Sequence, residues 1–100
     1  MSESPIMCTL STADLQRRRD ELLPGLMRRA ELRETIPGGL RMRFAESSDL
    51  MVDLVRMIDA ERQCCRFLRF QLMVEPDLGP IWLEVTGPAG TTEFLSELSR

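Results

Sequence analysis

The chain has 100 residues, of which 43% are hydrophobic and 29% charged, and this composition is typical of one globular domain spanning residues 1–100. Its 16 acidic residues outnumber its 13 basic ones, so the net charge is −3 and nucleic acid is disfavoured as a partner. A domain of this size buries one modest core and would gain stability from dimerisation or from a larger host protein.

The first part of the chain predicts a short strand followed by a helix. Residues 6–10 favour the strand, and Ser11 or Thr12 can cap the helix. Leucines at helical spacing supply an apolar face. Pro24 and Gly25 are expected to kink or restart this helix before it ends near residue 29 or 30.

Two hairpins and two further helices are predicted after it. Residues 32–36 and 40–44 flank the turn sequence Pro37-Gly38-Gly39. Ser47 or Ser48 then caps a helix over residues 49–65. In the second hairpin, Phe70, Leu72 and Val74 share an inward face with Ile81, Leu83 and Val85 across a turn at residues 76–79. A short helix around Phe94 closes the chain.

These elements define an α+β fold. We expect a mainly antiparallel sheet of two hairpins with the helices packed on one face, in the order α-ββ-α-ββ-α, with the additional N-terminal strand at residues 6–10. The first ten residues contain no basic segment, and no apolar stretch approaches the roughly 20 residues of a membrane span. A cytoplasmic protein without a membrane partner is therefore expected.

The helix over residues 49–65 contains the most informative residues of the chain. At about 100° per residue, a single apolar face includes Leu50, Met51, Leu54, Met57, Ile58 and Cys65. Cys65 should therefore point into the protein, with Cys64 at the margin of this face. Glu61 falls near its middle, and an unpaired buried carboxylate is costly. Glu61 therefore either pairs with an arginine such as Arg62, Arg66 or Arg69, or lines a small polar site together with the cysteines.

Three cysteines, Cys8, Cys64 and Cys65, dominate the reactive groups because the chain has no histidine. Most nucleophile–base pairs and ordinary zinc sites are thereby excluded, so thiol chemistry is the first hypothesis. Redox dithiols are spaced Cys-x-x-Cys at a helix N-terminus, whereas this adjacent pair is predicted at a C-terminal end, where the dipole opposes the thiolate. Thiol–disulfide catalysis is therefore disfavoured.

A soft metal ion displaces thiol protons directly, so the same position permits a metal site. Cys64 and Cys65, with Cys8 and Glu61 in support, are the candidate ligands for Hg(II), As(III), Cu(I) or Zn(II). Zinc is the weaker candidate because a closed tetrahedral site needs a fourth ligand besides the three sulfurs. The alternative interpretation is that the cysteines pack as small hydrophobic residues.

The segment Glu61-Arg62-Gln63-Cys64-Cys65-Arg66-Phe67-Leu68-Arg69-Phe70, followed by Gly79-Pro80-Ile81-Trp82-Leu83-Glu84-Val85-Thr86-Gly87-Pro88, resembles a family of small, largely uncharacterised bacterial proteins with the vicinal-cysteine signature E-x-x-C-C-x-F-x-x-F. Similar segments occur as tails on mercury-resistance-type (MerR-like) regulators and near metal-resistance genes. The resemblance implies a cytoplasmic sensory or metal-handling accessory, and it carries no established activity.

A second surface is predicted on the outward face of the second hairpin, where Met73 lies opposite Trp82. This face could bind a partner, which would be either a second copy of the chain in a homodimer or a regulator protein. The alternative is that the N-terminal helix covers it.

Three functional hypotheses result from these patterns. The first is thiol-based binding or sensing of a soft metal or metalloid ion, accessory to resistance or regulation. The second is a non-catalytic interaction or dimerisation module with structural cysteines. The last is an enzyme with Cys65 as nucleophile and Glu61 as base, which ranks lowest because the chain has no cofactor motif and no recognisable oxyanion donor.

Overall fold

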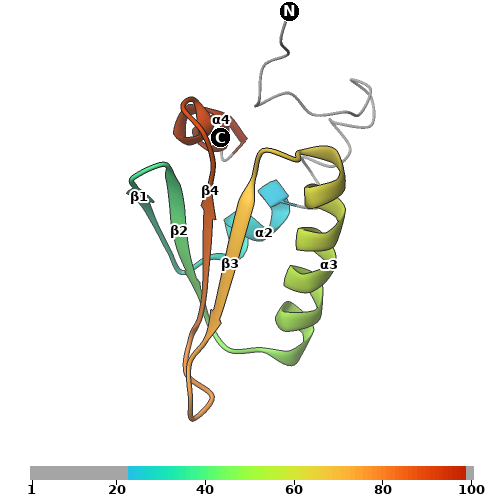
Figure 1. The fold of residues 1–100 in the computed structure, drawn as a ribbon. Helices are drawn as coiled ribbons and strands as arrows, with labels where there is room; N and C mark the ends of the chain where they lie inside the picture. The colour runs from blue at the N-terminus through green and yellow to red at the C-terminus, as the bar shows by residue number, and fades with distance from the viewer. Residues whose placement is uncertain (1–22, 99–100) are drawn as a thin grey trace, which may run out of the picture.

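A computed structural model describes residues 23–98, which form three helices and a four-stranded antiparallel sheet (Figure 1). In chain order the elements are α2 (Leu23–Arg29), β1 (Leu32–Ile36), β2 (Gly39–Phe44), α3 (Ser48–Cys64), β3 (Arg69–Val74), β4 (Ile81–Thr86) and α4 (Thr91–Leu98). The predicted order α-ββ-α-ββ-α is confirmed. The strand expected at residues 6–10 and the helix cap at Ser11 or Thr12 lie outside the described residues. Within the described range, no helix is long and apolar enough to cross a membrane.

The sheet joins the two hairpins through their second strands. Its order is β1-β2-β4-β3, and all three neighbouring pairs are antiparallel. The helices α2, α3 and α4 lie on one face, as predicted, and α3 runs alongside the edge that ends in β3 (Figure 1). Among the described strands, β1 and β3 are the two edges of the sheet.

The first hairpin is tighter than the sequence suggested. Gly39 was predicted as part of the turn, but it is the first residue of β2 and pairs with Ile36. Pro37 and Gly38 alone form the loop. Gly38 has a φ of 81°, a left-handed conformation that glycine adopts without steric cost. Proline followed by a glycine with positive φ is the chemistry of a two-residue turn, which explains why the strands extend one residue further.

The second hairpin turns through two residues in the left-handed region. Asp77 has a φ of 59° and Leu78 a φ of 55°, and the Gly79 N–H donates to the Pro76 carbonyl at 3.0 Å. Positive φ at both central positions matches the right-handed twist of hairpin strands. Val74, predicted to be inward, shares the face of Ile81 by register but is 58% exposed. Along β3, Phe70 and Leu72 pack against the core, and this packing ends before Val74, the last residue of the strand.

Leu78→Gly is expected to stabilise the protein by about 1 kcal/mol, because a leucine in the left-handed region carries a steric cost that glycine avoids. Leu78 is 79% exposed, so little packing is lost. The free energy of unfolding in urea measures the effect. Leu78→Ala is the matched control, since it removes the exposed side chain but keeps the strained backbone, and it should give no gain. Equal stability of the two variants would contradict the turn-strain argument.

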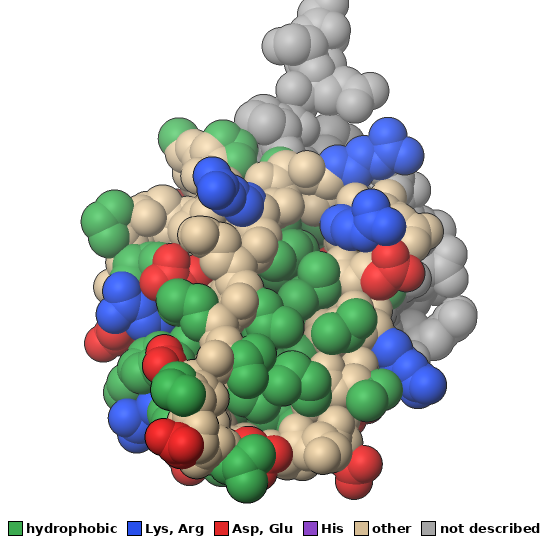
Figure 2. Space-filling model, turned by 60° about the horizontal axis from the view of Figure 1, so that its bottom comes forward, with side chains coloured by type: hydrophobic (Ala, Val, Ile, Leu, Met, Phe, Trp, Pro, Cys, Tyr) green, Lys and Arg blue, Asp and Glu red, His purple; other side chains and the backbone are tan. Residues whose placement is uncertain are grey.

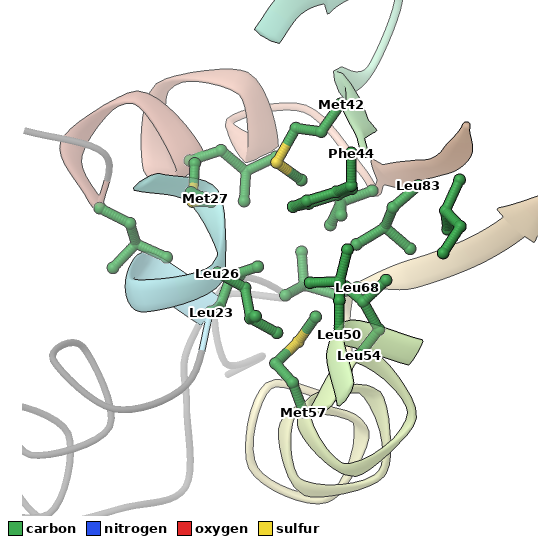
Figure 3. Packing of buried hydrophobic residues seen from close by; sticks show 14 of the residues in the cluster. Leu23, Leu26, Met27, Met42, Phe44, Leu50, Leu54, Met57, Leu68 and Leu83 are labelled. Carbon is green, nitrogen blue, oxygen red and sulfur yellow. The ribbon is translucent and has the colours of Figure 1, made fainter. Parts of the chain in front are cut away.

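The core fills the space between the inward face of the sheet and the three helices. The labelled side chains of α2, α3, β2 and β4 converge on one space (Figure 3). Alternation along β2 and β4 puts every second residue into this core, as expected for a sheet with one buried face. The fully buried large hydrophobic side chains are Phe44, Leu23, Met27, Met42, Leu54, Met57, Ile81, Leu83, Leu95 and Val85.

Candidate functional site

The C-terminal end of α3 is the candidate site, and a well-defined helix places it. Ser47 is the N-cap, and its hydroxyl accepts a hydrogen bond from the Leu50 N–H at 3.2 Å. From this start, residues spaced three or four apart turn inward, so Leu50, Leu54 and Met57 are buried. One turn further along this face are Glu61 and then Cys65, which are 4% and 2% exposed. The predicted inward orientation of both residues is confirmed.

Glu61 contacts a segment that is distant in the sequence. Its Oε2 accepts a hydrogen bond from the backbone N–H of Leu23 in α2, at an N–O distance of 3.4 Å. Arg62, one of the arginines considered as its partner, instead forms an ion pair with Asp59 at 2.9 Å. Arg66 and Arg69 are exposed. The carboxyl group of Glu61 therefore helps to hold α2 against the end of α3.

Cys65 forms the C-cap of α3. Its N–H donates to the Glu61 carbonyl at 2.6 Å, and its carbonyl accepts from the Leu68 N–H at 3.1 Å. These two bonds end the helix and lead the chain into β3. The Cys65 sulfur is disulfide-bonded, and its partner lies outside the described side chains. The sulfur must be reduced before it can act as a thiolate ligand or nucleophile.

The structure places only part of the predicted ligand set. Glu61 and Cys65 lie one turn apart on the same buried face of α3. Cys64 is the last residue of α3, but its side chain is not described, and Cys8 lies outside the described residues. Among the side chains that are described, no three metal-ligating groups come together. The candidate metal site therefore stays a prediction.

The outward face of the sheet contains a second cluster, centred on Trp82. Met73 lies opposite Trp82, as the sequence predicted, and is 41% exposed. The guanidinium groups of Arg41 and Arg43 lie 5.9 and 5.8 Å from the centre of the Trp82 ring. At these distances each arginine makes a cation–π contact with the indole. The described helices lie on the other face.

Ion pairs hold the two arginines of this cluster in place. Arg41 bonds to Glu84 at 3.1 Å and to Glu34 at 3.0 Å, and Arg43 bonds to Glu31 at 3.3 Å. The sequence pattern predicted neither of these arginine contacts with Trp82. The alternation of Arg41 and Arg43 in β2 signals an outward position, but only the pairing of β2 with β4 brings them to Trp82.

Comparison with known proteins yields no relative: no family model matches the chain, and no curated protein or solved structure is significantly similar to it. The functional interpretation therefore depends on the residues and their positions.

Proposed function

We propose that the C-terminal end of α3 is a thiol-based site that binds or senses a soft metal or metalloid ion, accessory to resistance or regulation. The observation that supports this function is the buried pair of Glu61 and Cys65, next in sequence to Cys64, at the C-terminal end of α3. A cysteine that forms a disulfide in one state offers a thiolate in the other, and thiolates select soft ions.

The proposal implies two chemical states. In the oxidised state Cys65 is bonded to another sulfur and offers no thiolate. Reduction frees the ligand, so ion binding is expected only from the reduced protein. A cytoplasmic location is part of the proposal, because that compartment keeps thiols reduced. The resemblance to vicinal-cysteine proteins near metal-resistance genes points to the same function.

Titration of the reduced protein with As(III) tests the function. The double variant Cys64→Ser, Cys65→Ser is expected to bind at least about 100-fold more weakly, because both adjacent soft ligands are replaced by hydroxyl groups. Zn(II) should bind more weakly than As(III) or Hg(II) to the unmodified protein. Cys8→Ser measures whether the third sulfur reaches the ion. If the double variant, shown to be folded by circular dichroism, takes up As(III) as well as the unmodified protein does, the metal function is wrong.

The outward cluster supports a second candidate function, a protein-interaction module. Two arginines contact the Trp82 ring, and the exposed Met73 lies opposite Trp82. Tryptophan, methionine and arginine are enriched at protein interfaces. We propose that this face contacts a partner protein of the regulator type that the sequence resemblance implies. In this function the cysteines are structural.

A further inference from the structure

The two edges of the sheet differ in how they are protected. In β1, Arg33, Glu34 and Thr35 are all exposed, and Glu34 forms an ion pair with Arg41. Charged residues on an edge strand discourage pairing with another chain. Strand β3 has the sequence Arg-Phe-Gln-Leu-Met-Val and has a single charge, at its first position. Among the described strands, β3 therefore presents an unprotected edge.

An apolar surface accompanies the β3 edge. Val74 at the end of β3 is 58% exposed, and Val55 on α3 is 53% exposed. Phe70 and Leu72 of β3, with Met51 and Ile58 of α3, are only partly buried. The space-filling view shows hydrophobic side chains gathered between the second hairpin and α3 (Figure 2). The edge of β3, which no other described strand pairs with, and the apolar side chains thus form one surface, which we call the β3 edge surface.

The sequence of β3, together with Glu75 directly after it, is complementary to itself in one antiparallel register. If Leu72 lies opposite the Leu72 of a second copy, Phe70 faces the partner's Val74, and Arg69 faces the partner's Glu75. Each end of the pairing then has one positive and one negative side chain, both exposed in the single copy. Apolar residues meet in the middle, where cross-strand pairs contribute most to stability.

Other registers lose this match. A shift by one residue would put the helices of the two copies on opposite faces of the joined sheet, because side chains alternate along a strand. A shift by two residues, centred on Gln71, would place Arg69 opposite Met73 instead of Glu75. A two-fold axis through Leu72 keeps all the helices on one face and gives an eight-stranded sheet across two copies.

We therefore propose that the β3 edge surface is the interface of a homodimer, in which two copies pair through antiparallel β3 strands centred on Leu72. The pairing continues the sheet from one copy to the other, and the backbone groups of the two β3 edges form hydrogen bonds with each other. It also covers the exposed side chains of Val74 on β3 and Val55 on α3. This interface differs from the Trp82 cluster, which stays on the outward face of the joined sheet. The proposal is independent of the metal function.

Sedimentation of the full chain in reducing buffer, at concentrations up to about 500 μM, tests the interface. The unmodified protein is expected to dimerise. Arg69→Glu and Glu75→Arg should each weaken the dimer about tenfold or more, because like charges then face each other at both ends. The double variant Arg69→Glu, Glu75→Arg should restore the affinity to within about threefold of the unmodified protein. Arg33→Glu on β1 is the matched control and should leave the dimer unchanged.

The charge-swap result separates this interface from the alternatives. Val74→Lys, at an exposed position, should also abolish the dimer without unfolding the chain. A monomer at the highest concentration overturns the proposal. So does a dimer that tolerates Arg69→Glu and Val74→Lys but is lost on Trp82→Ala, which would assign the interface to the outward cluster. The cysteines stay reduced in this buffer, so no disulfide contributes to the dimer. If the protein is a monomer, the dimer proposal fails, but the As(III) titration still tests the metal function.

Discussion

Gly39→Ala is expected to lower the free energy of unfolding by about 3 kcal/mol or more, among the largest losses that one methyl group can cause here. A Cβ at this position would collide with the Val85 carbonyl oxygen and lie 2.8 Å from the Thr86 Cα. Both are backbone atoms of the neighbouring strand, so no side-chain rotation relieves the contact. The central strands β2 and β4 would have to move apart where they pair. Urea denaturation of the two proteins measures the loss.

Gly38→Ala is the matched control for this prediction. Gly38 also has a constrained backbone, with a φ of 81°. A Cβ added at Gly38, however, would lie 3.6 Å from its nearest atom, the Gly87 carbonyl oxygen, which is an ordinary van der Waals contact. Only the cost of the left-handed conformation applies, about 1 kcal/mol. A loss at Gly39 no larger than the loss at Gly38 would show that the strands yield easily and that the close approach of β2 and β4 has little energetic weight.

Phe44→Ala is expected to destabilise the protein by about 4 kcal/mol, a large fraction of the roughly 5–15 kcal/mol by which a domain is stable. Phe44 is the last residue of β2, is fully buried and pairs with Ile81 across the centre of the sheet. Truncation leaves a cavity in the space on which α2, α3 and the strands converge (Figure 3). The variant should unfold at a much lower urea concentration than the unmodified protein, as measured by near-ultraviolet circular dichroism.

Phe44→Leu keeps most of the volume and should cost only about 1 kcal/mol. Leu32→Ala, at an exposed position of the β1 edge, should change stability by less than about 0.5 kcal/mol. If Phe44→Ala proved no more harmful than Leu32→Ala, the core would have to lie elsewhere than between the sheet and the helices.

The sequence predicted those features that local periodicity determines. The α3 face from Leu50 to Cys65, the burial of Glu61 and the outward pair Met73 and Trp82 all emerged as expected. Each depends only on residue spacing within a helix or across one hairpin. The start of β2 at Gly39 was not predicted, because a glycine at the end of a turn sequence can belong either to the turn or to the paired strand.

Features that depend on distant contacts were not predictable. The hydrogen bond from Leu23 to Glu61 joins residues on two helices, and the arginine contacts with Trp82 require β2 to lie next to β4. The disulfide bond of Cys65 was not predictable either, because connectivity among three cysteines cannot be deduced from spacing alone. The sequence therefore indicated which residues make up the candidate site, but it did not predict their contacts with distant parts of the chain.

The pairing of β2 with β4 also has a consequence for the order of folding. Each hairpin can form from neighbouring residues, but the central pair joins segments roughly 40 residues apart, with α3 in the intervening chain. Closing so long a loop costs entropy that is repaid only when both hairpins and the helix are packed together. The first hairpin with α3 lacks a complete core, and so does the second hairpin with α4. The two hairpins and their helices should therefore acquire stable structure in one cooperative transition.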